Sequence, residues 1–184
     1  MFKHFDQCHS QVLHRPLVTG IIDTTECPVQ HSMNTNTQRT FYSGKKKQHT
    51  VKYELVWDLA MELFSWVNGP FPGSVHNLTI AHQGVLNYLS IHEILLGDLA
   101  YLGEPSFFTP IKREQGQSLS KLAEVFNQLL EAERVEVERV ICRLKVFNCL
   151  HTTWRHSLEF HSSCFTLIVC IVNINLCFFP LTRK

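Results

Sequence analysis

An apolar stretch that runs directly into a carboxylate constrains this chain more than any other feature. Residues 17–22 are Leu, Val, Thr, Gly, Ile and Ile, and Asp23 follows them, with two threonines behind it. Isoleucine, valine and threonine suit a pleated backbone, so we predict a short buried strand that ends at Asp23. Binding sites in open sheets form at such strand ends. Aspartate also favours turns and helix N-termini, and this stretch alone leaves that role for Asp23 equally open.

The same pattern recurs in the middle of the chain. Residues 91–97 form a compact apolar run interrupted by His92 and Glu93, and Asp98 follows it. We therefore predict a second buried strand that places a carboxylate at its end.

A third carboxylate lies on a predicted helix over residues 118–147, which is rich in Leu, Glu, Ala, Arg and Val. Glu136 and Glu138 are two residues apart, so they point to nearly opposite faces at about 100° per residue. Glu138 borders the apolar stripe, whereas Glu136 faces away with arginines three and seven residues later. We predict that Glu138 reaches the edge of the sheet and that Glu136 is a solvated, paired charge. The stripe consists of Val137, Val140, Ile141 and Leu144.

Strand patterns and turn signals alternate between these elements. We predict a hairpin of strands over residues 49–58 and 61–67, in which the first strand has one wetter face. The sequence GPFPGS at 69–74 is predicted to break regular structure, with Ser74 capping a helix over about 75–90. Turn-forming residues predict loops over 27–44 and 101–117.

The two ends of the chain differ in character. Residues 1–16 are polar and predict an irregular lead-in. Residues 151–176 predict a further, mostly buried helix, and 177–184 a short tail. The apolar run 164–180 is slightly short for a membrane span of about 20 residues, and Asn173 and Asn175 are costly in lipid, so we favour a buried element over a membrane anchor.

Composition limits the class of protein. The chain is 45% hydrophobic and 18% charged, which excludes a disordered chain, and its net charge of +1 restricts nucleic-acid binding to local patches. Lys45, Lys46 and Lys47 form such a patch; they either contact DNA phosphates or make a solvated turn. The seven cysteines show no CxxC pair or zinc-like spacing, which predicts free thiols in a reducing, intracellular compartment, nuclear or cytoplasmic.

Two strand-end aspartates and one helical glutamate make a recognisable kind of site. Oxygen-only ligands suit hard cations such as Mg²⁺ or Mn²⁺. Three neighbouring carboxylates repel one another unless a cation lies between them. Two such ions about 3.5–4 Å apart can cleave a phosphodiester bond.

Several phrases of the chain, taken in order, resemble one family. They lie at residues 20–26, 42–52, 72–77, 95–101 and 134–138, with 144–145 behind the last. They are similar to the DDE-superfamily endonuclease domain of Harbinger-like and related bacterial insertion-sequence transposases. The resemblance covers about residues 17–176 and implies an α/β, RNase H-like fold with a mixed sheet flanked by helices. It also implies that Asp23, Asp98 and Glu138 bind and use the metal ions, and that Arg134 pairs with Glu138 or touches a phosphate.

The resemblance implies an enzyme that cleaves or joins DNA, with two divalent ions as cofactors and a nuclear location in a eukaryote. Asn77 departs from the family pattern, which has an aspartate there. Only 22 residues precede Asp23, too few for a helix-turn-helix region, so we expect a truncated copy. Its own DNA binding would be weak and non-specific, and a separate protein would supply recognition. The alternative is an inactive, domesticated remnant that serves as a binding or scaffold protein.

Overall fold

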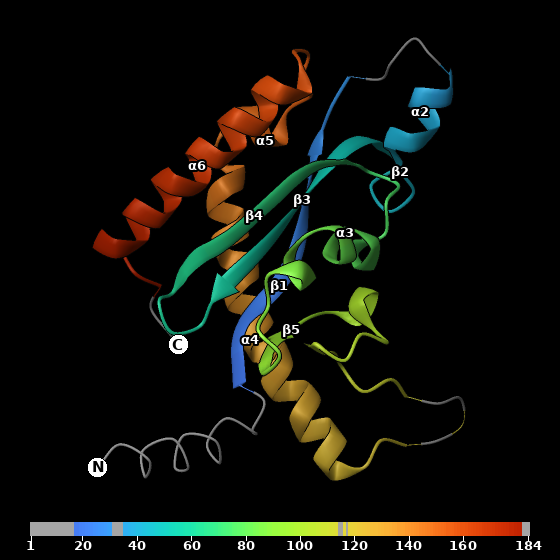
Figure 1. The fold of residues 1–184 in the computed structure, drawn as a ribbon, viewed down its shortest axis with the longest axis vertical. Helices are drawn as coiled ribbons and strands as arrows, with labels where there is room; N and C mark the ends of the chain where they lie inside the picture. Colours follow the sequence, from blue (N-terminus) through green and yellow to red (C-terminus); the bar gives the residue numbers. More distant parts are fainter. Residues whose placement is uncertain (1–16, 31–34, 114–115, 117, 182–184) are drawn as a thin grey trace, which may run out of the picture.

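A six-stranded mixed sheet forms the centre of the molecule. The computed structural model describes residues 17–30, 35–113, 116 and 118–181; the predicted lead-in over 1–16 lies outside them. Strand β1 (Leu17–Pro28) pairs antiparallel with β3 (Gln48–Asp58) and parallel with β5 (Glu93–Leu96) (Figure 1). Strand β6 (Phe107–Phe108) continues parallel to β5, while β4 (Leu63–Pro72) and β2 (Tyr42–Ser43) pair with β3. This arrangement confirms the predicted α/β, RNase H-like fold.

Strand β1 is longer than predicted, and Asp23 lies in its middle rather than at its end. β3 pairs with β1 from Gly20 to Pro28, so the backbone stays extended well beyond Asp23. On the other side, β5 pairs with β1 only as far as Ile21. The apolar pattern therefore marked where one neighbour ends, not where the strand ends.

The predicted hairpin of β3 and β4 is present, but two details differ. β4 continues through Pro70 to Pro72, because it lies at the outer edge of the sheet, where a missing N–H costs no pairing on the open side. The second face of β3 is the wetter one, as predicted, at Lys52 and Asp58, which are partly exposed, but Glu54 between them is completely buried. Residues of the following helical segment cover it, with the Val85 N–H 3.4 Å from the Glu54 carboxylate.

The segments around the hairpin contain more regular structure than expected. Helix α2 (Thr35–Phe41) and β2 lie within the predicted loop 27–44, and β6 lies within 101–117. The helix predicted over 75–90 is shorter: α3 (Asn77–Gln83) ends before Gly84, and a 3-10 turn, Val85–Asn87, follows. Its N-cap position is His76, not Ser74.

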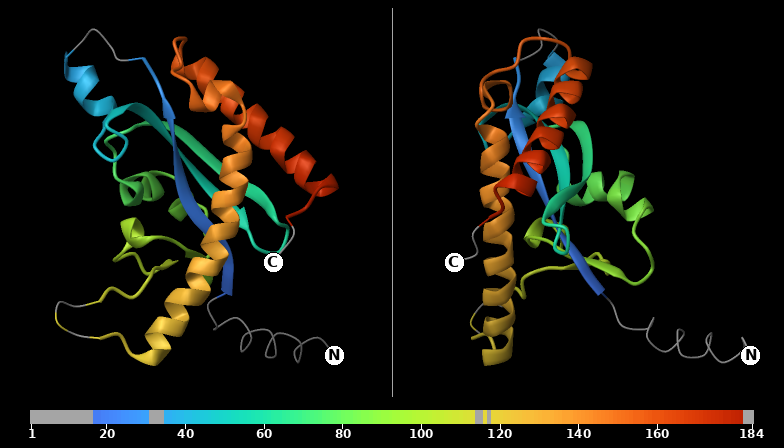
Figure 2. Two further views of the ribbon diagram at one scale, coloured as in Figure 1. Left: turned by 180° about the vertical axis from the view of Figure 1, so that it is seen from behind. Right: turned by 90° about the vertical axis from the view of Figure 1, so that its left-hand side faces the viewer.

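Three further helices cover one face of the sheet, and α3 lies on the other (Figure 2). Helix α4 (Lys121–Lys145) begins at the cap Ser120, whose hydroxyl accepts from the Ala123 N–H. A short helix, α5 (Asn148–His151), joins it to α6 (Leu158–Phe178), which begins later and ends later than predicted. The larger core lies between the sheet and α4, α5 and α6.

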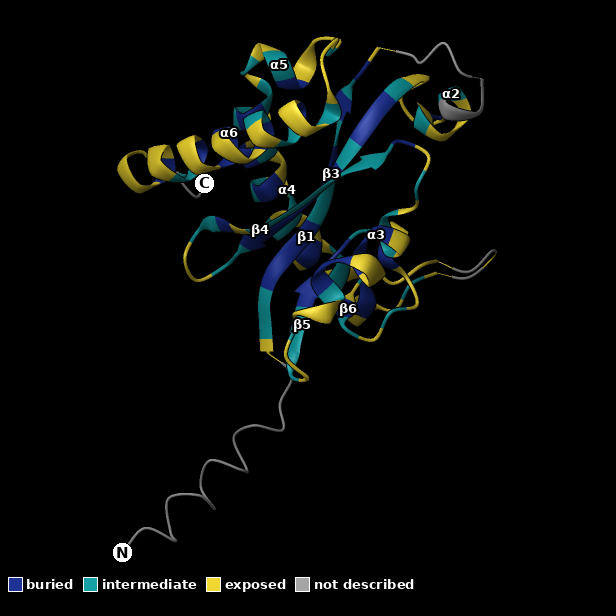
Figure 3. Ribbon diagram, turned by 45° about the horizontal axis from the view of Figure 1, so that its top comes forward, coloured by how far each residue is buried: buried dark blue, intermediate teal, exposed yellow. Residues whose placement is uncertain are grey.

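Helix α6 is buried on one side only, so the prediction of a mostly buried helix is wrong. Its length and composition would suffice to cross a membrane, yet one face packs against the sheet. The opposite face is exposed (Figure 3). The buried residues are His161, Phe165, Ile168, Val169, Val172 and Leu176.

Candidate active site

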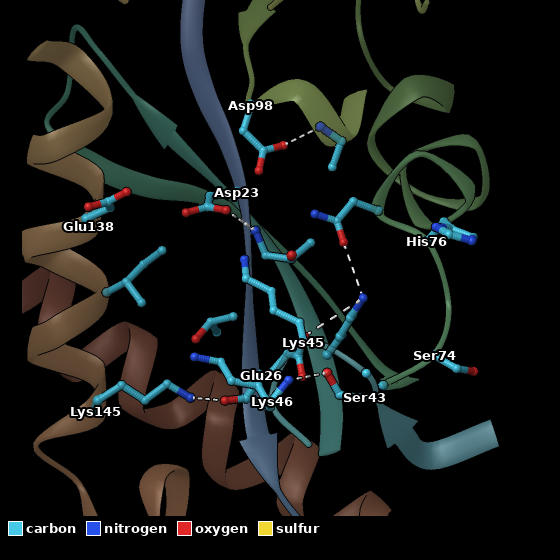
Figure 4. Close-up of a pocket in the computed structure, with 18 of the residues that line it drawn as sticks. Asp23, Glu26, Ser43, Lys45, Lys46, Ser74, His76, Asp98, Glu138 and Lys145 are labelled. Atoms are coloured by element: carbon cyan, nitrogen blue, oxygen red, sulfur yellow. Dashed lines mark hydrogen bonds and ion pairs between the residues drawn. The ribbon is translucent and has the colours of Figure 1, made fainter. Parts of the chain in front are cut away.

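A cleft of about 640 Å³ opens between β1, α4 and the turn that joins β2 to β3. Asp23, Asp98 and Glu138 line it from three different elements (Figure 4). The other charged side chains along the cleft are Glu26, Lys45, Lys46, Lys52 and Lys145. The cleft therefore combines a group of carboxylates with a group of ammonium groups.

Strand register explains why the two aspartates meet here. Ile21 of β1 pairs with Leu96 of the parallel strand β5, and no pairing follows between these strands. Asp23 and Asp98 each come two residues after that last pair. Asp23 shares the strand face of Ile21, which packs toward α4, because side chains alternate along a strand. Asp98 also caps a 3-10 turn, Leu99–Tyr101, by accepting from the Ala100 N–H at 2.9 Å.

The environment of Asp23 disfavours its charged form. Burial raises the pKa of Asp23 to about 6, and the nearby charges of Asp98 and Glu138 act in the same direction. A hydrogen bond from the Thr24 N–H at 2.7 Å and the charge of Arg134 act against them. A cation beside Asp23 would therefore stabilise its charged form and lower its pKa.

Glu138 reaches the cleft from α4, whereas Glu136 is not among the cleft residues in the described part of the chain. The Glu138 side chain is 55% exposed, and its Oε1 lies 3.5 Å from Nη2 of Arg134, one turn earlier. Arg134 also donates to Glu131 at 3.2 Å. Arg134 thus holds Glu138 on the helix surface.

The carboxylates fit a hard cation by chemistry but do not yet enclose one. Among the residues that the structure describes, no three His, Cys, Asp or Glu side chains form a group that could hold a metal ion. Asp23, Asp98 and Glu138 offer only oxygen donors, and their charges oppose one another at Asp23. Closing the group requires movement of a side chain, and Glu138 is the most exposed of the three carboxylates.

The three lysines that we predicted to contact DNA do not all face the cleft. They lie in the turn between β2 and β3, and Lys45 and Lys46 line the cleft. Lys47 has a φ of 54° and its N–H donates to the Ser43 carbonyl, which closes the turn. Lys47 does not appear among the described residues that line the cleft.

Two lysines that received no role from the sequence brace the cleft walls. Lys52 Nζ donates to the Val75 carbonyl at 2.8 Å and to Asn77 Oδ1 at 3.4 Å, and it lies 4.0 Å from Glu26. Glu26 and Lys52 are register partners of β1 and β3, which only strand pairing could reveal. Asn77 is therefore part of the cleft wall.

Lys145 joins α4 to the far end of β1. Its Nζ donates to the carbonyls of Glu26 and Leu150 and lies 3.2 Å from Cys27 Sγ. These contacts occupy its three donors, so Lys145 fixes the distance between helix and strand. In the sequence, the sign that Lys145 belongs to the cleft was its spacing of seven residues from Glu138. That spacing places both side chains on one face of the helix.

Comparison with known proteins identifies relatives of the domain. The model of the DDE superfamily endonuclease family matches residues 22–173. The probable transposase for insertion sequence element IS702 from Microchaete diplosiphon is 29% identical over 140 residues, which cover 74% of this chain and 49% of the relative. The chain thus spans about half the length of that curated relative. No solved structure matches the chain.

Proposed function

Because the chain belongs to the DDE superfamily endonuclease family, we propose that its cleft cleaves DNA phosphodiester bonds with the help of divalent metal. The observation that carries this proposal is the meeting of Asp23, Asp98 and Glu138 along one cleft. Supporting it, burial and the two neighbouring carboxylates raise the pKa of Asp23. A bound cation would offset the repulsion between these carboxylates.

Asp23, Asp98 and Glu138 would hold Mg²⁺ or Mn²⁺. The resemblance to Harbinger-like transposases implies two such ions. When bound, such ions activate the attacking oxygen and stabilise the leaving 3′-oxygen. Side chains of the protein would bind the DNA and position the metal ligands. Lys45 and Lys46 bind phosphates that flank the scissile bond, as sequence-blind contacts. Arg134 would position Glu138 beside the cleft through the contact of 3.5 Å between Nη2 and Oε1.

Recognition of a particular DNA sequence belongs, in this proposal, to a separate protein or to a further region. The curated relative is about twice as long as the matched part, so its whole activity does not transfer to this chain. The cleft offers few phosphate contacts, so the chain alone binds DNA weakly and without sequence preference.

The test is nicking of supercoiled plasmid in Mg²⁺ or Mn²⁺, with EDTA as the metal-free condition. We expect metal-dependent nicking by the wild-type chain and none by Asp23→Asn or Asp98→Asn. Metal should also raise the melting temperature of the wild-type protein, because an ion that binds only the native state stabilises it. A folded chain that melts identically with and without millimolar metal would count against a metal site.

A second candidate is a DNA-binding protein that has lost cleavage. One observation favours it: the carboxylates do not close into a three-residue group in the described part of the chain. The same assays separate the two, since the remnant retains salt-sensitive DNA binding but neither nicks DNA nor gains stability from metal.

A further inference from the structure

The outer face of α6 is exposed in the part of the chain that the structure describes (Figure 3), and a row of large apolar residues lies along it. Leu167 is 61% exposed and Phe178 is 75% exposed, although both belong to a helix whose other face is in the core. Glu159 is the single Asp, Glu, Lys or Arg in the helix. A surface helix normally has charged residues on its solvent side, so this face has the composition of a covered one.

The spacing of this row is that of a coiled-coil seam. Residues 160, 164, 167, 171, 174 and 178 follow one another at alternating intervals of four and three, which is the a/d pattern of a heptad. The side chains are Phe160, Cys164, Leu167, Ile171, Ile174 and Phe178. The core-facing residues occupy other heptad positions, so packing on the sheet leaves the seam free. The seam spans about 27 Å at 1.5 Å per residue.

We propose that a second copy of this chain docks along α6, with the two α6 helices antiparallel. Charge supports both the partner and the direction. Glu159 lies at the N-terminal end of the seam, and Arg143 of α4 lies beside its C-terminal end, donating to the Phe179 carbonyl at 3.0 Å and to Asn175 Oδ1 at 3.3 Å. An antiparallel pair places Glu159 of each copy beside Arg143 of the other. A parallel pair would place like charges together.

The antiparallel register also matches the side chains. With the twofold axis near Val169, Leu167 of one copy meets Ile171 of the other, and Phe160 meets Phe178. The two copies of Cys170, which is exposed, then face each other close to the axis, whereas the two copies of Cys177 lie about 24 Å apart along the seam. The proposal does not depend on nuclease activity, because the cleft residues lie on other elements.

The first experiment measures the mass of the full chain by light scattering at micromolar concentration. We expect twice the monomer mass for the wild type. Leu167→Glu and Ile174→Glu, each on the exposed seam, should give monomers of unchanged circular dichroism. Leu129→Glu is the matched control, because Leu129 is 65% exposed on α4, away from the seam, and this variant should remain a dimer.

Cross-linking tests the direction of the helices. In a Cys8→Ser, Cys142→Ser background, a short bis-maleimide should link two copies through Cys170. Adding Cys170→Ser should abolish the link, and adding Cys177→Ser should leave it. Equal linking through Cys177 would overturn the antiparallel arrangement.

Charge exchange tests the contact between Glu159 and Arg143. Glu159→Arg or Arg143→Glu alone should weaken the dimer at least several-fold, and the double exchange should restore it. A wild-type chain that stays monomeric at about 100 µM would overturn the proposal. So would a monomer that partitions onto phosphatidylcholine vesicles, since that would make lipid the partner of this face.

Discussion

Asp23 and Asp98 come two residues after Ile21 and Leu96, the last paired residues of two neighbouring parallel strands. Beyond that pair the strands no longer share hydrogen bonds, and the cleft begins there. The two aspartates are 75 residues apart in sequence, yet strand register fixes their proximity. The buried position of Asp23 beside Asp98 also predicts how replacing its carboxylate should change the stability of the protein.

Asp23→Asn should stabilise the metal-free protein at neutral pH. Burial raises the pKa of Asp23 from 3.8 to about 6, so between these values the folded chain keeps a proton that the unfolded chain loses. The free energy of unfolding therefore falls as pH rises from about 4 to 6, by about 1–3 kcal/mol at 1.36 kcal/mol per unit. Urea unfolding in EDTA should show the variant more stable at pH 7 and equal at pH 3.5. A variant less stable than the wild type at pH 7 would contradict this.

Glu138→Gln should remove the stabilisation by Mn²⁺, and Glu136→Gln should preserve it. Both residues lie on α4, but only Glu138 lines the cleft among the residues described. The pair is a matched control for helix propensity and charge. Melting temperature as a function of Mn²⁺ concentration is the measurement. The reverse pattern would transfer the metal role to Glu136.

Lys45→Ala and Lys46→Ala should weaken DNA binding, whereas Lys47→Ala should have little effect. The first two line the cleft, while Lys47 closes the turn through its backbone. Each lost phosphate contact should lower the salt slope of the binding constant by about 0.9. Fluorescence anisotropy across a salt series, with two unrelated duplexes, measures both slope and sequence preference. An equal loss at all three positions would show that total turn charge matters, not the cleft.

His161 should make the protein less stable in mild acid. Its ring is buried, its Nδ1 lies 2.7 Å from the Tyr53 hydroxyl, and burial lowers its pKa from 6.5 to about 4. As pH falls through this interval, the unfolded chain binds a proton at this histidine and the folded chain does not. The free energy of unfolding therefore falls by on the order of 3 kcal/mol.

The variant for this test is His161→Gln, which keeps an acceptor for Tyr53. Its free energy of unfolding should change less between pH 6.5 and pH 4.5 than that of the wild type. The exposed His151 provides the control, because His151→Gln should retain the wild-type pH dependence. An unchanged pH dependence in His161→Gln would assign acid sensitivity to other groups.

Local patterns were sufficient for much of the fold. The alternation over residues 49–58 predicted β3, and the apolar run before Asp98 predicted β5. The composition of residues 118–147 predicted α4, and its apolar stripe predicted the direction of the Glu138 side chain. These features depend on residues within one or two turns or pleats of one another. Such information is complete in the sequence because the interacting residues are neighbours along the chain.

Tertiary structure alone decided the features that depend on partners. β1 passes beyond Asp23 because β3 pairs with it, and Pro70 and Pro72 stay in β4 because that strand has an open edge. Glu54 is buried because a distant helical segment covers it. Helix α6 is apolar on both sides in the sequence, and only packing shows which side is used. Pairing and burial join residues that are far apart in the chain, so no local periodicity carries that information.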